Sequence, residues 1–133
     1  MNLNEKTLFY QQLFKLAESK GKEQVALLWR ELSRGDLYFL LKYVCKSASY
    51  LFDGASEKKL NWLYDRCVEV QNAPDGHLDL WFREAGKSTI ITFGKTIQDI
   101  INDPEVTVGI FSHTRPIAKG FLRQIKRELE NKS

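Results

Sequence analysis

The sequence has few of the residues that cross-link small folds or bind metal ions. Its two cysteines, Cys45 and Cys67, make neither a disulfide framework nor a metal site. Both lie among apolar helical positions, which predicts buried thiols in a reducing cytoplasm. No apolar run is long enough to cross a membrane, and Met1–Lys6 lacks the apolar core of a secretory signal. A net charge of +3 is only mildly basic, so charge alone does not indicate a nucleic-acid partner.

The first half of the chain has the apolar periodicity of amphipathic helices. Asp36 and Ser56 are good N-caps for the third and fourth of these helices. Residues 46–56, between the third and fourth helices, are predicted to form a loop. The predicted helices cover residues 4–19, 23–33 and 37–45, and a fourth segment from Ser56 through Val70.

A turn signal, Pro74-Asp75-Gly76, separates this helical pattern from a different one. Before the turn every predicted element is a helix, and after it strands and helices alternate. The predicted domain organisation is therefore an N-terminal helical region, residues 1–73, and a second region, residues 74–133.

A strand, a loop and a helix are predicted in succession after the turn. Leu78, Leu80 and Phe82 occupy alternate positions, which is the period-2 pattern of a strand. The next segment, Gly86-Lys87-Ser88, has the form of the end of a phosphate-binding loop. A helix is predicted to open at about Gly86, because the apolar residues behind it fall on one helical face: Ile90, Phe93, Ile97, Ile100 and Ile101.

The residue types in this loop suit a triphosphate, which carries dense negative charge. Backbone N–H groups at a helix N-terminus can meet phosphate oxygens, and the helix dipole favours them. Gly86 has no Cβ, so the backbone can approach the phosphates. Lys87 would place a cation at the β and γ phosphates, and Ser88 would offer a hydroxyl to Mg²⁺. Thr89 can hydrogen-bond a phosphate oxygen from the next position.

The match to the phosphate-loop signature is partial, because Trp81 stands where the signature has its first glycine. A second Gly-Lys-Thr, at Gly94–Thr96, falls within the helical pattern and has no strand before it. On spacing alone, an ordinary turn that enters a surface helix stays an alternative to phosphate binding.

A second strand and a last helix complete the predicted pattern. Val106–Phe111 is a near-continuous apolar run, typical of a buried parallel strand. Pro116 suits the first turn of the helix that follows. A strand, a crossover helix and a second strand predict one right-handed βαβ unit. The predicted fold class is therefore α/β: an incomplete P-loop NTPase domain preceded by the N-terminal helical region.

The stretch Trp81–Thr89 resembles the variant Walker A motif of phage terminase large subunits, the ATPases that pump DNA into viral capsids. In that family an arginine commonly stands where Arg83 stands here, and the first glycine is often missing. The likeness continues through Val108–Thr114 and Ala118–Leu122, which resemble the family's second strand and the helix after it. The resemblance covers about residues 60–130 well and the N-terminal helices more loosely.

This resemblance implies an ATP-binding protein that uses Mg²⁺. Arg83 and Lys87 would be the catalytic residues, with Arg83 at the γ-phosphate, and Ser88 would bind Mg²⁺. Gln71, ahead of the motif, would contact the adenine. Glu84 is expected to be a solvated loop residue and not a catalytic base. The nucleotide-binding set implied by the family is Gln71, Arg83, Glu84, Ala85, Gly86, Lys87, Ser88 and Thr89.

The resemblance also implies partners and a location. The complete motor would act on double-stranded DNA as an oligomeric ring, with the portal protein and the small terminase subunit. It would work in the cytoplasm of the bacterial host, at the procapsid portal, with no membrane involved. A nuclease domain in the full-length family also cuts the packaged DNA.

Hydrolysis needs two acidic groups that the family carries after its second strand and helix, and the sequence does not provide them there. One is an acidic residue after another apolar strand to hold Mg²⁺, and the other is a carboxylate to activate water. The 133 residues are therefore expected to be an N-terminal part of a large subunit that binds nucleotide weakly and does not turn it over. Two alternatives stay open: another P-loop ATPase or kinase fragment, and a non-enzymatic helical interaction protein in which Gly-Lys-Ser is incidental.

Overall fold

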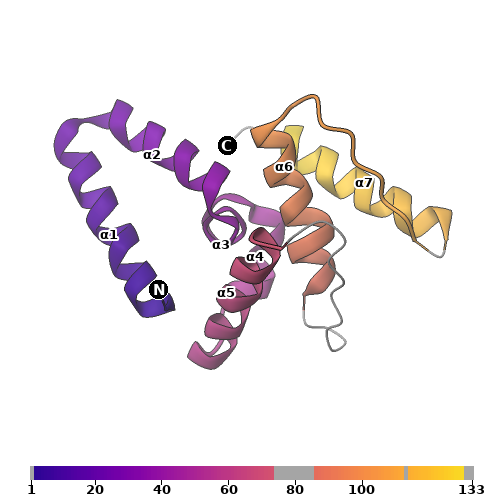
Figure 1. Cartoon of the computed structure of the whole chain (residues 1–133), viewed down its shortest axis with the longest axis horizontal. Helices are drawn as coiled ribbons and strands as arrows, with labels where there is room; N and C mark the ends of the chain where they lie inside the picture. The colour runs from indigo at the N-terminus through magenta and orange to yellow at the C-terminus, as the bar shows by residue number, and fades with distance from the viewer. Residues whose placement is uncertain (1, 74–85, 113, 131–133) are drawn as a thin grey trace.

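The computed structural model describes residues 2–73, 86–112 and 114–130. Figure 1 shows helices joined by turns, with one long irregular segment before the last helix. Of the described residues, 81% are helical, and these residues form no strand and no sheet. The predicted α/β fold is therefore wrong, and the described part of the chain is an all-α structure.

The first two helices, α1 (Leu3–Lys20) and α2 (Lys22–Gly35), form a hairpin at one side of the molecule (Figure 1). Asn2 starts α1 with a capping box: its side chain accepts from the Glu5 N–H, and the Glu5 carboxylate accepts from the Asn2 N–H. Gly21 joins the helices at a φ of +118°, a backbone conformation that suits glycine. Both helices predicted for this part of the chain are confirmed.

Asp36 begins the next helix, as predicted, and its carboxylate accepts a hydrogen bond from the Phe39 N–H at 3.2 Å from N to Oδ1. The helix starts as α3 (Leu37–Phe39) and continues into a π-helical turn, η1 (Leu40–Val44). Local widening of this kind leaves no mark in the apolar periodicity, so the sequence predicted one uniform helix.

The segment predicted as a loop, residues 46–56, is partly helical. It contains a 3₁₀ turn, η2 (Lys46–Ala48), and a single α-helical turn, α4 (Ser49–Phe52). Turns this short show no repeat that a sequence pattern could reveal. Ser56 then caps α5 (Glu57–Gln71) by accepting from the Lys59 N–H at 3.2 Å from N to Oγ, and this predicted helix is confirmed.

The centre of the core is the apolar run Leu37–Leu41, in which every side chain is buried. A helical segment that is apolar on all sides must be surrounded by other elements. Here α5 packs on α3, and α2 covers both α3 and η1. Side chains from both predicted regions meet in this single core, including Leu63 of α5 and Phe93 from beyond residue 74.

The helix predicted to open at about Gly86 is confirmed. It consists of a second π-helical run, η3 (Ser88–Lys95), continued by α6 (Thr96–Asn102). Gly94 lets η3 approach η1 closely, because a Cβ added at Gly94 would lie 2.6 Å from Leu41 Cδ2. Gly94 lies inside a helix, as predicted, and the structure adds that this glycine is required for packing.

The second predicted strand is not formed. Residues 106–112 are irregular, and no backbone group from Thr107 to Ser112 takes part in a hydrogen bond within the described structure. A strand exists only as part of a hydrogen-bonded ladder, and the described residues supply no partner strand. The other predicted strand, residues 77–82, lies outside the described residues. The apolar run therefore had the composition of a strand without the pairing that makes one.

The last helix, α7 (Arg115–Glu130), is confirmed with Pro116 in its first turn. It packs on η3 and α6, and Ile125 is the residue that it buries in the core. Among the described helices, none combines the length and the apolar character that crossing a membrane requires.

Candidate functional site

Gly86 stands immediately before the helix that carries the candidate phosphate-binding residues. Its φ is +87°, in the left-handed region that favours glycine. Its carbonyl accepts from the Ile90 N–H at 2.9 Å from N to O, the first bond of that helix. A Cβ at Gly86 would lie 2.8 Å from both Leu51 methyl carbons. Backbone conformation and packing thus already require glycine at this position.

Lys87 and Ser88 lie in the first turn of the helix, and both side chains are exposed. The first N–H groups of a helix have no acceptor inside it, and the helix dipole adds positive potential there. A lysine ammonium beside such a terminus adds a full positive charge. Chemically, this arrangement can bind an anion such as a phosphate group.

Thr89 is placed differently from Lys87 and Ser88. Its side chain is 6% exposed, and its hydroxyl shares a hydrogen bond of 2.5 Å with the Tyr50 hydroxyl. This hydrogen bond connects α4 to η3. The Thr89 hydroxyl is therefore engaged by Tyr50. Tyr50 has no place in any sequence motif, so only the three-dimensional structure relates it to the candidate site.

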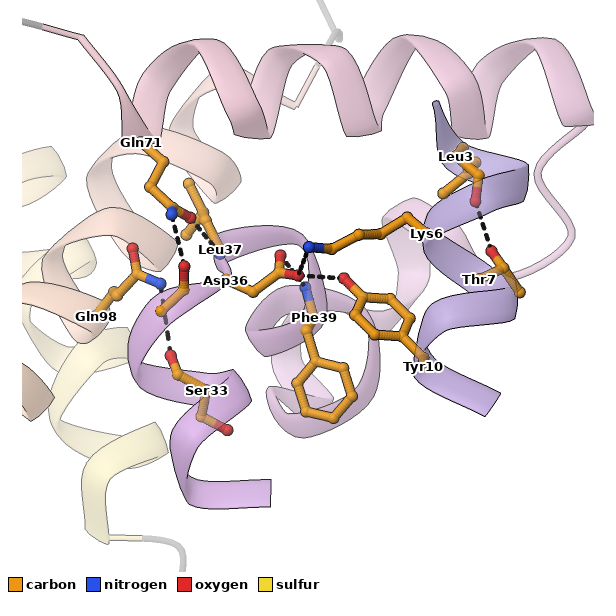
Figure 2. A network of polar contacts seen from close by, with 11 residues as sticks. Leu3, Lys6, Thr7, Tyr10, Ser33, Asp36, Leu37, Phe39, Gln71 and Gln98 are labelled. Atoms are coloured by element: carbon orange, nitrogen blue, oxygen red, sulfur yellow. Dashed lines mark hydrogen bonds and ion pairs between the residues drawn. The ribbon is translucent and has the colours of Figure 1, made fainter. Parts of the chain in front are cut away.

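Gln71 closes the corner between α2 and α3 (Figure 2). Its side-chain nitrogen donates to the Gly35 carbonyl at 2.6 Å, and its side-chain oxygen accepts from the Leu37 N–H at 2.7 Å. Both ends of the amide are therefore engaged by the backbone of one corner. An adenine contact would have to replace these bonds, and that role of Gln71 stays a prediction.

The remaining predicted site residues, Arg83, Glu84 and Ala85, lie outside the described residues. The role of Arg83 at a γ-phosphate and the catalytic role of Lys87 therefore stay predictions. Ser88 is the predicted Mg²⁺ ligand, and no group of three or more potential metal-ligating side chains occurs among the residues that the structure places. Gly86, Lys87 and Ser88 are thus the part of the predicted site that the structure brings together.

Comparisons with protein-family models, with curated proteins and with solved structures each give no match to this chain. The resemblance to terminase large subunits consequently rests on the motif residues alone.

A second candidate site lies where the irregular segment before α7 meets that helix (Figure 1). A groove of about 210 Å³ separates them. Two large apolar side chains on this groove are exposed, Val108 by 42% and Leu122 by 51%. Phe111, next in the chain to the lining residue Ile110, is 95% exposed. We call this region the α7 surface. The residues that line the groove are Val108, Ile110, Arg115, Ala118, Lys119 and Leu122.

The α7 surface was missed from the sequence because its residues had a different explanation there. Val108 and Ile110 were interpreted as part of a buried strand, and Ala118 and Leu122 as part of the helix that resembles the terminase helix after it. Periodicity shows that a helix has an apolar face, but it does not show whether another part of the chain covers that face.

Proposed function

We propose that this chain is a helical interaction module that binds another protein through the α7 surface and has no catalytic activity of its own. The observation that carries the proposal is the exposure of Val108 and Leu122 on one groove, together with that of Phe111, which is next in the chain to the lining residue Ile110. Scattered exposed apolar residues are ordinary, whereas a cluster of large ones around a groove is typical of a protein-binding site. The all-helical fold supports this function over that of a P-loop enzyme.

The charges around the α7 surface indicate the chemistry of the partner. Arg115 and Lys119 line the groove itself, and Arg123 is exposed one turn of helix further along. A partner with an apolar centre and carboxylates at its rim would match both the apolar and the charged features. Covering an exposed phenylalanine or leucine side chain contributes about 1.5–3 kcal/mol, so two such anchors would dominate the binding energy.

The test uses a double variant with both anchors removed, Phe111→Ser with Leu122→Gln. The tagged full chain is used to capture proteins from the source cells, and each captured protein is then purified and titrated by calorimetry. A partner at the α7 surface should bind the double variant at least about tenfold more weakly than the wild type. The matched control is Val68→Gln on α5, an apolar residue 40% exposed elsewhere on the molecule, which should leave the affinity unchanged. Equal affinity for the wild type and the double variant would refute the proposal.

A second candidate function is nucleotide binding by residues 86–88, as the ATP-binding N-terminal part of a viral packaging motor. One observation favours it: the left-handed Gly86 leads directly into a helix whose first turn exposes Lys87 and Ser88. The resemblance to terminase large subunits supports the same function and adds Arg83. In this candidate Lys87 binds the β and γ phosphates and Ser88 binds Mg²⁺, with DNA, the portal protein and the small subunit as partners.

Thermal unfolding with and without MgATP distinguishes the two candidates. A ligand present at a hundred times its dissociation constant stabilises the folded state by about 2.7 kcal/mol, which gives a clear rise in melting temperature. Lys87→Ala should abolish that rise. Lys95→Ala is the matched control, because Lys95 belongs to the second Gly-Lys-Thr and pairs with Asp99 at 3.0 Å inside the helix. No rise in the wild type would eliminate nucleotide binding and leave the interaction module.

A further inference from the structure

The α1–α2 hairpin carries two apolar stripes that face a common groove of about 260 Å³. Each stripe follows the spacing i, i+3, i+4, i+7, which places its residues along one side of a helix. Both stripes combine apolar residues with a charged residue at one end. The α1 stripe is Leu13, Leu16, Ala17 and Lys20, and the α2 stripe is Gln24, Leu27, Leu28 and Glu31.

This groove adjoins the face through which the hairpin packs on the rest of the molecule. Leu3 and Tyr10 bury that face of α1 against the core, and Ala17, seven residues after Tyr10, is the buried residue at the edge of the groove. In contrast, Leu16 is 56% exposed and Leu27 is 48% exposed. Of the residues in α2, only Ser33 is buried. The hairpin, which lies at the opposite edge of the molecule from α7 (Figure 1), therefore carries exposed leucines beside a groove that no other described element lines.

We propose that a second copy of this chain occupies the groove, so that two hairpins form a four-helix arrangement. The positions of the two charges support this occupant. Lys20 lies at the turn end of the groove, next to Gly21, and Glu31 lies near the open end, nine residues into α2. Helices rise about 1.5 Å per residue, so the two charges are roughly 13 Å apart along the hairpin.

A two-fold axis across the groove would bring these charges together between copies. When two hairpins pack in opposite directions, the turn end of each meets the open end of the other. Lys20 of each copy then lies at the same level along the bundle as Glu31 of the second copy, at the two ends of a buried leucine layer. A two-fold interface must be complementary to itself, and this groove carries both members of the charge pair at the required ends.

The test is sedimentation of the full chain from about 1 µM to about 1 mM, a range that covers weak to moderate self-association. The wild type should change from monomer to dimer within this range. Leu16→Lys with Leu27→Lys should stay monomeric, because two exposed leucines of the groove are replaced by cations. Leu8→Lys is the matched control: Leu8 is a 58% exposed leucine on α1 that does not line the groove, and its replacement should leave dimerisation unchanged.

Charge exchange supplies a second, independent readout. Lys20→Glu and Glu31→Lys should each weaken dimerisation about tenfold, and the double exchange should restore it, because each charge would again meet its opposite in the second copy. A wild type that stays monomeric throughout the range would overturn the proposal. So would a dimer that the two groove substitutions leave intact, or a double exchange that fails to restore dimerisation.

Discussion

Asp36 and Tyr10 connect two helices across 26 residues of sequence, because the Tyr10 hydroxyl donates a hydrogen bond to the Asp36 carboxylate (Figure 2). The same carboxylate accepts from the Phe39 N–H and pairs with Lys6 at 3.5 Å from Nζ to Oδ2. Burial, followed by the hydrogen bond to Asp36, raises the pKa of Tyr10 far above its ordinary range, so the hydroxyl stays a donor. A single carboxylate thus caps α3 and holds α1 against it.

Removal of this carboxylate should be more damaging than removal of the hydroxyl. Asp36→Ala should lower the free energy of unfolding by about 2–4 kcal/mol, since it deletes an N-cap and leaves the buried Tyr10 hydroxyl without its acceptor. Tyr10→Phe should cost only about 1 kcal/mol, because Asp36 keeps its other partners. Lys6→Ala, the control at a part-exposed ion pair, should cost less than about 1 kcal/mol. Urea unfolding measures all three, and a Tyr10→Phe loss as large as that of Asp36→Ala would contradict the assignment.

Gln71 should likewise be important for stability. Gln71→Ala removes both bonds to the corner at Gly35 and Leu37 and leaves a part-buried N–H without its acceptor, so it should lower the free energy of unfolding by about 1–3 kcal/mol. Gln71→Glu keeps an acceptor for the Leu37 N–H but places a second acceptor against the Gly35 carbonyl, so it should also destabilise the protein at neutral pH. Lys58→Ala on the exposed side of α5 is the control and should stay within about 0.5 kcal/mol. An unchanged unfolding midpoint for Gln71→Ala would show that the corner does not depend on this amide.

Two helical glycines offer a matched test of the contact between η1 and η3. Gly94→Ala should cost about 1–3 kcal/mol, because the new methyl group would lie 2.6 Å from Leu41 Cδ2. Gly120→Ala in α7 meets no atom within 4 Å and should instead stabilise the protein by about 0.5–1 kcal/mol. Leu41→Ala should cost less in the Gly94→Ala background than in the wild type, since the two positions share one space. Changes of the same sign at both glycines would contradict the packing at Gly94.

The features that the sequence predicted correctly are those that a local signal specifies. Ser56 and Asp36 cap the helices expected of them, and the helix behind Gly86 opens at the expected place. Each of these features depends on a few residues next to one another in the chain. Local propensity and capping are sufficient to specify them.

The features that were wrong or missed depend on partners far away in the sequence. Val106–Phe111 has the composition of a buried strand, but pairing decides whether a strand forms, and composition carries no information about pairing. Apolar periodicity correctly predicted the helix that contains Leu16, but it could not show that this side chain is 56% exposed beside a groove. The hydroxyl contact of Thr89 with Tyr50 spans 39 residues, and no motif could have indicated it.

The two cysteines predict a loss of stability at alkaline pH. Burial, followed by the Glu128 carboxylate, raises the pKa of the Cys45 thiol from 9.0 to about 12, and burial also raises the pKa of Cys67. Above pH 9 the unfolded chain therefore loses these protons while the folded chain retains them. Titration of these thiols should leave the free energy of unfolding unchanged below about pH 9. As the pH rises from about 9 to about 12, the free energy of unfolding should fall by about 1.4 kcal/mol per pH unit for each such thiol.

Urea unfolding at a series of pH values measures this slope, and Cys45→Ala should make it shallower by the contribution of one thiol. Tyr10 and Tyr38, whose pKa values burial also raises, should steepen the fall in the wild type and in the variant alike. Thiol alkylation gives an independent check, because the thiolate is the reactive form. Near pH 8 both cysteines should resist iodoacetamide in the folded protein and react fully in urea. Rapid labelling of the folded protein near pH 8, or a slope that Cys45→Ala leaves unchanged, would show that these thiols are not held in their protonated form by the fold.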